Sequence, residues 1–345
     1  MITIEKTFLS EYTVSEKTLF FDIETTGLSR QYHRVYLIGC AHFKEGKFKL
    51  VQWLAESKLE EMEVLESFFL YAASFDTLIH FNGSRFDIPF IEARSLPYAL
   101  DNPLSQMYSI DLYKIAKRLA PLLGLSNVKQ KTVEQFLQIK RLDEYSGGEL
   151  ILVFDRFCKT GNDEEKRLLL LHNEEDVIGM TKLLALQKYE DYFQSNFSFI
   201  KAKETTNEIS LFYTTDSTIP YSFKSQPSSY LIEGSSNQLV LTLPILELEL
   251  KHYFNDTKNY YYFPEMDRAI HKSVATFMEG EKKRCNKQNC YIKHKGLFIP
   301  QPSAIFTPEF KKEAKSSIFY APYKPELFQN NEQAHLFLQS VLTLH

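Results

Sequence analysis

"LFFDIETTGLS" (residues 19–29) runs apolar up to an aspartate and places a glutamate two residues later. Side chains alternate between the two faces of an extended strand, so we expect Asp22 and Glu24 on the same face. Two carboxylates this close repel each other, and both lose hydration where the strand is buried. We interpret the pair as part of a metal-binding site, because bound cations would offset that repulsion. A solvated strand end is the alternative.

The surrounding sequence predicts a mixed sheet. Strand patterns rich in β-branched and aromatic residues occupy residues 18–23, 34–43 and 47–54. Helical and strand patterns then alternate as far as Gly124, with a short apolar strand at 77–81. Three strands joined by short loops, followed by alternating helices and strands, predict an antiparallel meander completed by βα units. This α/β arrangement is the strand order of an RNase H-like domain.

The second part of the chain has a different pattern. After about residue 200, strand-like segments dominate, and a hairpin is predicted over residues 277–300. An amphipathic helix is predicted over residues 332–344. We therefore predict an RNase H-like domain over residues 1–198 and a smaller, strand-rich accessory domain over residues 199–345.

Composition excludes several classes of protein. The 345 residues are 44% hydrophobic and carry a formal net charge of −4, so the chain is not a basic protein that coats nucleic acid. Its start lacks the pattern of a secretory signal, and no apolar run approaches the roughly 18 residues of a membrane span. Four scattered cysteines do not form a disulfide framework. We expect a cytoplasmic protein with reduced thiols and no membrane association.

Two further segments carry acids. In "IHFNGSRFDIPFIEAR", Asp87 opens a helix that follows a strand, and capping of that helix is the alternative role. In "LLLLHNEEDVIGM", His172 and Asp176 are four residues apart, which places both on one face of a helix. A solvated helix face is the alternative for these two. The same spacing predicts that Asn173 and Glu175 point elsewhere.

An RNase H-like sheet would bring the acids of these elements to one place. Mg²⁺ commonly binds through a few carboxylates and substrate phosphate, and two ions about 3.5–4 Å apart assist in-line phosphoryl displacement. We predict two Mg²⁺ or Mn²⁺ ions, with His172 as the general base that takes a proton from the attacking water. The predicted ligands are Asp22, Glu24, Asp87 and Asp176.

Three motifs in order, "DIETTG", "FNGSRFDIPF" and "HNEEDV", resemble those of the DEDD (DnaQ-like) 3′–5′ exonuclease superfamily. The stretch "KTVEQFLQIKRLDEYSGGEL", leading into the helix with His-Asn-x-x-Asp, is similar to the YprB-type RNase H-like family. The resemblance covers residues 17–190. It implies a nuclease that releases nucleoside 5′-monophosphates from single-stranded nucleic acid with a free 3′ end.

The resemblance also implies roles for individual residues. Asp22 and Glu24 match the ligands of the first motif, Asp87 the acid of the second, and Asp176 the ligand of the third, while His172 stands where the superfamily places its base. Residues that match the contacts to the terminal nucleotide and the substrate strand are Thr25, Thr26, Gly27, Leu28 and Asn82. The main branches place a tyrosine with three intervening residues, or a histidine with four, before the last aspartate. Here the histidine stands at the tyrosine spacing.

Several alternatives stay open. A non-catalytic nucleic-acid-binding protein or a scaffold could keep this fold, although buried like charges without metal would be destabilising. Endonuclease activity is a further possibility within the nuclease class. Asp111 is interpreted as a helix cap, and the spacing of Cys285 and Cys290 argues against a zinc site. The basic residues of 282–295 are interpreted as a solvated hairpin, with phosphate binding as the alternative.

Overall fold

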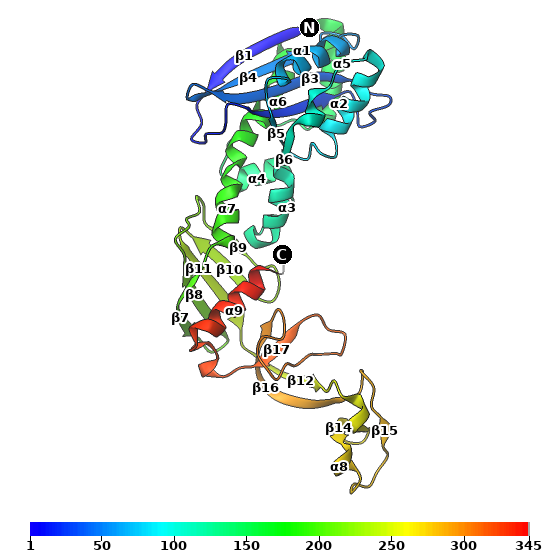
Figure 1. Cartoon of the computed structure of the whole chain (residues 1–345), viewed down its shortest axis with the longest axis vertical. Coiled ribbons are helices and arrows are strands. Elements are labelled where there is room, and N and C mark those ends of the chain that lie inside the picture. Colours follow the sequence, from blue (N-terminus) through cyan, green and yellow to red (C-terminus); the bar gives the residue numbers. More distant parts are fainter. Residues whose placement is uncertain (344–345) are drawn as a thin grey trace. The chain divides into compact units, whose positions relative to one another are not determined.

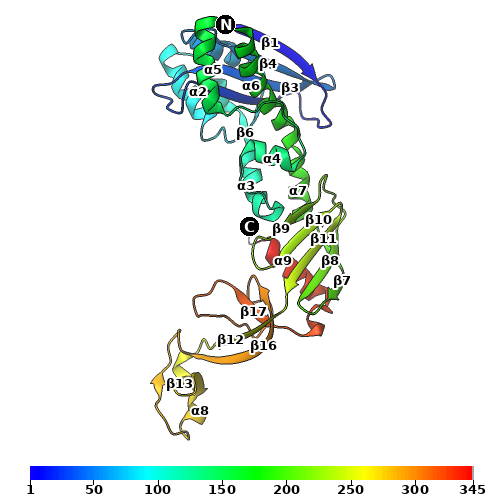
Figure 2. The same cartoon turned by 180° about the vertical axis from the view of Figure 1, so that it is seen from behind.

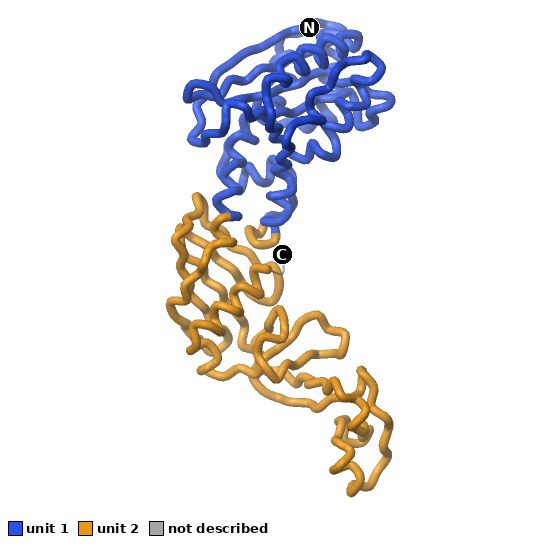
Figure 3. Tube along the Cα trace, viewed as in Figure 1, with its two compact units in different colours: residues 1–120, 125–190 blue, residues 121–124, 191–345 orange. Residues whose placement is uncertain are grey.

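The computed structural model describes residues 1–343, which form two compact units. One unit contains residues 1–120 and 125–190, and the other contains residues 121–124 and the chain from Asp191 onward (Figure 3). The domain boundary expected between residues 198 and 199 stays a prediction. Each unit has its own sheets.

A six-stranded mixed sheet forms the centre of the first unit (Figures 1 and 2). The spatial order is β1-β4-β3-β2-β5-β6, antiparallel from β1 to β2 and parallel from β2 to β6. The predicted meander and βα units are confirmed, and the fold is RNase H-like. The strands are β1 (Ile2–Phe8), β2 (Thr18–Thr25), β3 (Val35–Lys44), β4 (Lys47–Leu54), β5 (Thr77–His80) and β6 (Tyr108–Asp111).

Strand β1 was not expected from the sequence. It pairs with β4 along its whole length, from Ile2 opposite Leu54 to Phe8 opposite Phe48. Most of its residues are exposed or half-buried, because it lies at the edge of the sheet. An edge strand needs no continuous apolar run, so its sequence "ITIEKTF" did not stand out.

Helices cover both faces of this sheet. Phe21 of β2 stacks on Phe68 of α1, with ring centroids 5.7 Å apart, so α1 lies on the face to which Phe21 points. Gln52 of β4 donates a hydrogen bond to the backbone carbonyl of Leu170 in α6, so α6 lies on the opposite face. The helices that begin in this unit are α1 (Glu61–Ala72), α2 (Asp87–Ser95), α3 (Leu112–Leu123), α4 (Gln130–Phe136), α5 (Gly147–Thr160), α6 (Asp163–Leu183) and α7 (Ala185–Gln194).

The second unit is strand-rich, as the sequence predicted. Its largest sheet has five antiparallel strands in the order β7-β8-β11-β10-β9, and two smaller sheets have the orders β12-β16-β17 and β14-β13-β15. Helix α9 (Asn331–Leu342) is the expected amphipathic helix, except that Leu344 lies outside the described residues. The strands are β7 (Ser198–Glu204), β8 (Glu208–Thr214), β9 (Phe223–Ser225), β10 (Leu231–Ser235), β11 (Gln238–Pro244), β12 (Leu246–Tyr253), β13 (Tyr260–Phe263), β14 (Arg268–His271), β15 (Lys283–Arg284), β16 (Tyr291–Gln301) and β17 (Phe319–Pro322), and the remaining helix is α8 (Lys272–Ala275).

The hairpin predicted over residues 277–300 is wrong. Strand β15 pairs with β13, whereas β16 pairs with β12 and β17, so the two halves of the expected hairpin belong to different sheets. Long-range pairing decided this arrangement, and the local turn pattern could not show it. None of the helices in the described part of the chain is long and apolar enough to cross a membrane.

Candidate active site

The two carboxylates of β2 lie on the face of the sheet that α6 covers. Asp22 is paired with Gly39 and Glu24 with Leu37 across the β2–β3 ladder, so both side chains point to the same face. Asp22 is half-buried and Glu24 is buried. This is the placement that the two-residue spacing predicted.

Asp87 is the first residue of α2, and its side chain reaches β2. Its Oδ1 accepts a hydrogen bond from the backbone N–H of Ile23 at 3.3 Å, so the carboxylate joins α2 to the strand that carries Asp22 and Glu24. Burial raises the pKa of Asp87 to about 7, because hydrogen bonds to its own N–H and that of Ile23 offset only part of the loss of hydration, and Asp111 and Asp176 add repulsion.

Helix α6 brings His172 and Asp176 to Glu24. The Nε2 atom of His172 lies 3.5 Å from Glu24 Oε1 and 3.3 Å from Asp176 Oδ2. Each of these three residues offers a ligand atom within 4.8 Å of the others. One turn of helix therefore faces the end of β2, as the four-residue spacing predicted.

The site contains more carboxylates than basic groups to pair with them. Burial raises the pKa of Asp22 and of Glu24 well above the usual range, and repulsion from Asp176 and Asp87 raises both further. Within residues 1–343, neither Asp22 nor Asp87 has a lysine or arginine nitrogen within 4.0 Å, and His172 is the one basic group at that distance from Glu24. Such a cluster needs either protons or a bound cation.

Asn173 contacts the site, contrary to the expectation that it points elsewhere. Its Nδ2 donates to Asp22 Oδ2 at 3.0 Å, and its Oδ1 accepts from Gln52 Nε2 at 2.9 Å. A Cβ at Gly39 would lie 1.9 Å from Asn173 Oδ1, so only glycine leaves room for this amide between β2 and β4. The expectation was wrong because Gly39 has no side chain, which leaves room for Asn173 against the sheet.

Arg141 was missed by the sequence analysis. Its Nη1 donates to Asp176 Oδ1 at 2.6 Å and to Glu134 Oε2 at 2.9 Å, and the side chain is almost fully buried. Asp176 consequently keeps Oδ2 directed toward His172 and Glu24. Arg141 lies in an irregular segment between α4 and α5, where no periodic pattern marks it; the signal available was a lone arginine within "IKRLDEY".

Asp143, two residues later, was also missed. Its Oδ2 lies 2.7 Å from His172 Nδ1, and it accepts a further hydrogen bond from Lys131 Nζ at 2.9 Å. Burial works to raise the pKa of Asp143, but Lys131 and His172 outweigh it, and the pKa lies below its usual value. Glu175 holds this segment in place by accepting from the backbone N–H groups of Leu142 and Asp143.

The residues expected to meet substrate follow β2 and β5. Thr25 Oγ1 donates to the carbonyl of Gly27, Thr26 Oγ1 accepts from the N–H of Arg34, and Leu28 is 85% exposed. Asn82 follows β5, which is parallel to β2, so both segments lie at the same edge of the sheet. Its backbone has a φ of +62°.

Asp111 holds that turn. Its Oδ1 accepts from the N–H of Asn82 at 2.8 Å and from the N–H of Tyr113, in the first turn of α3, at 3.1 Å. The interpretation of Asp111 as a helix cap agrees with the second of these bonds.

A cavity of about 420 Å³ lies beside these segments. The exposed loop after β2 and the start of α2 line this cavity, and two of the lining residues are arginines. The lining residues are Leu28, Ser29, Arg30, Gln31, Arg85, Phe86 and Phe90.

Comparison with known proteins agrees with this geometry. Residues 19–187 match the model of the RNase H superfamily. The chain is 30% identical over 167 residues to the uncharacterized protein YprB of Bacillus subtilis (strain 168), a match that covers 48% of this chain and 40% of that relative. The resemblance to the YprB-type RNase H-like family is thereby confirmed, and the chain spans less than half the length of that relative.

Solved structures are similar over a comparable part of the chain. The family B DNA polymerase from the archaeon Pyrobaculum calidifontis is 12% identical, with a TM-score of 0.41 over 56% of this chain and 33% of that one. A product-bound exonuclease I is 11% identical, with a TM-score of 0.29 over 57% of this chain and 58% of that one.

Proposed function

We propose that this chain, whose residues 19–187 match the RNase H superfamily model, is a metal-dependent 3′–5′ exonuclease of the DEDD type. The observation that carries the proposal is the meeting of Glu24, His172 and Asp176 at the end of β2, beside the half-buried Asp22. Several carboxylates and a histidine that meet at one edge of a sheet are suited to the hydrolysis of a phosphodiester. The 3′ polarity follows the motif resemblance.

The donor set fits hard divalent cations. All four candidate ligands are carboxylates. Three of them, Asp22, Glu24 and Asp87, have no lysine or arginine nitrogen within 4.0 Å in the described chain. Burial and mutual repulsion raise the pKa values of these three groups. We propose that Asp22, Glu24, Asp87 and Asp176 hold two Mg²⁺ or Mn²⁺ ions. When bound, such ions stabilise the attacking and leaving oxygens of an in-line displacement.

We propose His172 as the general base. The ionised Asp143 only accepts hydrogen bonds, so His172 donates from Nδ1 and directs Nε2 toward Glu24 and Asp176. Asp143 fixes both the tautomer and the orientation of the ring. A water molecule near the carboxylates could then give its proton to Nε2.

The terminal nucleotide would lie on the segment from Thr25 to Leu28. Arg30 and Arg85 line the cavity beside this segment, and guanidinium groups suit phosphate oxygens. Asn82, at the same sheet edge, would contact the substrate strand. We propose a single-stranded substrate with a free 3′ end.

No disulfide forms among the described residues, which supports the cytoplasmic location that we propose.

The test uses 5′-labelled single-stranded DNA and RNA of one sequence, incubated with purified protein and Mg²⁺ or Mn²⁺. A ladder that shortens from the 3′ end is expected, and Asp22→Ala should abolish it. His172→Ala should slow hydrolysis by about 10²–10⁴-fold. Asp101→Asn, which changes an exposed carboxylate, should keep full activity and serves as the matched control.

Two results would refute parts of the proposal. Internal cleavage of a circular single strand would indicate an endonuclease. Binding of either strand without hydrolysis in any divalent metal would indicate a non-catalytic binding or scaffold protein.

A further inference from the structure

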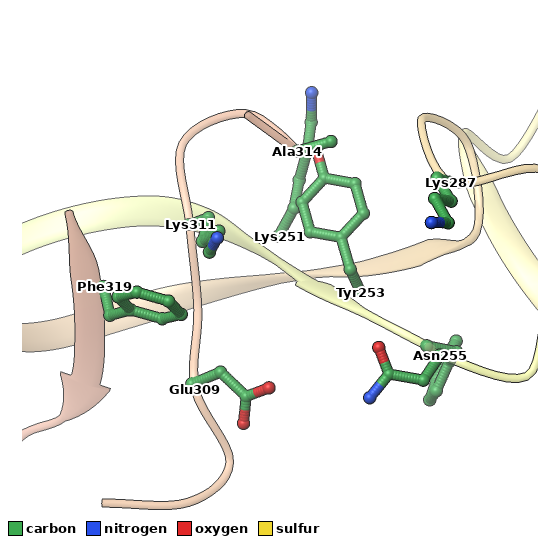
Figure 4. Close-up of a pocket in the computed structure, with 9 residues that line it drawn as sticks. Lys251, Tyr253, Asn255, Lys287, Glu309, Lys311, Ala314 and Phe319 are labelled. Atoms are coloured by element: carbon green, nitrogen blue, oxygen red, sulfur yellow. The ribbon is translucent and has the colours of Figure 1, made fainter. Parts of the chain in front are cut away.

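The second unit contains a cleft of about 310 Å³ that combines lysines with aromatic rings. It lies where β12 meets the segment that leads into β17 (Figure 4). Side chains from three separate parts of the chain line it. They are Lys251, Tyr253, Phe254, Asn255, Lys287, Glu309, Lys311, Ala314 and Phe319.

Three lysines stand directly opposite one another across neighbouring segments. Lys251 of β12 is paired with Lys293 of β16 on one side and with Lys311 on the other. Two backbone hydrogen bonds of 2.9 Å fix Lys251 and Lys311 in this register. Directly opposed residues share a face, and like charges in that position are destabilising.

Acidic neighbours neutralise two of these three lysines and leave the third, Lys311, without an ion pair in the part of the chain that the structure describes. Lys293 forms an ion pair with Asp267, and Lys251 lies 3.2 Å from both carboxylate oxygens of Glu313. Lys311 is half-buried, and within the described chain no carboxylate oxygen lies within 4.0 Å of its Nζ. Its ammonium lies 4.1 Å from the centroid of the Phe319 ring. Lys287, on the far wall of the cleft, is exposed and likewise has no ion pair among residues 1–343.

The aromatic residues give the cleft a second kind of surface. Tyr253, Phe254 and Phe319 line the cleft and are half-buried. Phe254 also stacks on Tyr260, with ring centroids 4.4 Å apart. Figure 4 shows Tyr253 beside the segment that carries Lys311 and Ala314, with the ring of Phe319 on the neighbouring strand. Rings beside Lys287 and Lys311, the two lysines of the cleft that have no ion pair among the described residues, are suited to stacked bases and their phosphates.

We propose that this lysine-aromatic cleft binds single-stranded nucleic acid. This inference rests on the proposed function, because it assigns the second unit to the same substrate class. Lys287 and Lys311 contact phosphates directly, Lys251 exchanges its contact with Glu313 for one with a phosphate, and the ring of Phe319 stacks on a base. A polyanion in the cleft relieves the repulsion between Lys251 and Lys311. An acidic protein segment would satisfy the lysines but would offer no planar base to the ring of Phe319, which stacks on no other ring of the described chain.

The test measures binding without hydrolysis. The full chain with Asp22→Ala, in EDTA, is titrated into a fluorescein-labelled 20-nucleotide single strand of DNA or RNA, and anisotropy is recorded from 0.05 to about 0.3 M salt. In that background, Lys251→Gln with Lys311→Gln should reduce the slope of log K against log salt by about 1.4, since each phosphate contact to a single strand contributes about 0.7. At 0.15 M salt this corresponds to a loss of affinity of about tenfold.

The matched control is Lys201→Gln with Lys203→Gln, which removes two exposed lysines from β7 in another sheet and should leave the slope unchanged. Phe319→Leu retains an apolar side chain but removes the ring, so it should weaken binding at all salt concentrations without changing the slope. An unchanged slope in the Lys251/Lys311 variant, or equal displacement of the strand by polyglutamate of matched charge, would overturn the proposal. Binding that depends on these lysines in a protein without nuclease activity would refute the proposed function alone.

Discussion

The pH dependence of the unfolding free energy that Asp87 contributes tests whether the carboxylates of the metal-free site are desolvated. Its pKa is about 7, against a usual value of 3.8. Between these values the folded protein binds a proton that the unfolded chain has released, so the free energy of unfolding falls as pH rises. For one group this loss is about 1.7 kcal/mol at pH 5 and about 4.3 kcal/mol at pH 8. Metal-free protein should therefore lose about 2.6 kcal/mol between pH 5 and pH 8 from Asp87 alone.

Asp87→Asn should remove that dependence. The amide oxygen can still accept from Ile23 N–H, but the side chain no longer ionises. The assay is urea unfolding in EDTA at several pH values, followed by the fluorescence of Trp53. This is the sole tryptophan of the chain, and it is buried in β4, so it reports on the first unit.

The difference between the unfolding free energies of Asp87→Asn and wild type should grow by about 2.6 kcal/mol from pH 5 to pH 8. The exposed control Asp101→Asn should run parallel to wild type. If the curves for Asp87→Asn and wild type also run parallel, Asp87 is not a desolvated carboxylate and the reasoning about the site fails.

Three further results are expected. Asp143→Ala should lower kcat by at least tenfold with little change in KM, because His172 loses the acceptor for Nδ1; a loss of substrate affinity alone would contradict this role. Gly39→Ala should lower the unfolding free energy by about 1–3 kcal/mol, since its Cβ would collide with Asn173, whereas Gly148→Ala, with open space around it, should not. Mg²⁺ or Mn²⁺ at a hundredfold excess over its Kd should raise the stability of the Trp53 transition by about 2.7 kcal/mol, and Asp22→Ala should abolish this gain.

The sequence predicted those parts of the site that depend on local periodicity. A strand repeats every two residues, so Asp22 and Glu24 had to share a face. A helix repeats every 3.6 residues, so His172 and Asp176 had to face the same neighbour. The central strands were visible because burial on both faces requires continuous apolar runs.

Tertiary structure decided everything that joins distant segments. Asn173 reaches Asp22 because Gly39 has no side chain between them, and that close approach has no periodic signature. Arg141 and Asp143 lie in an irregular segment whose position is fixed by Glu175 of another element. In the second unit, Lys251 and Lys311 are sixty residues apart in sequence, and only the pairing of their backbones makes them neighbours. Local repeats determine which way a side chain points, but what it meets depends on the packing of elements that the repeats do not encode.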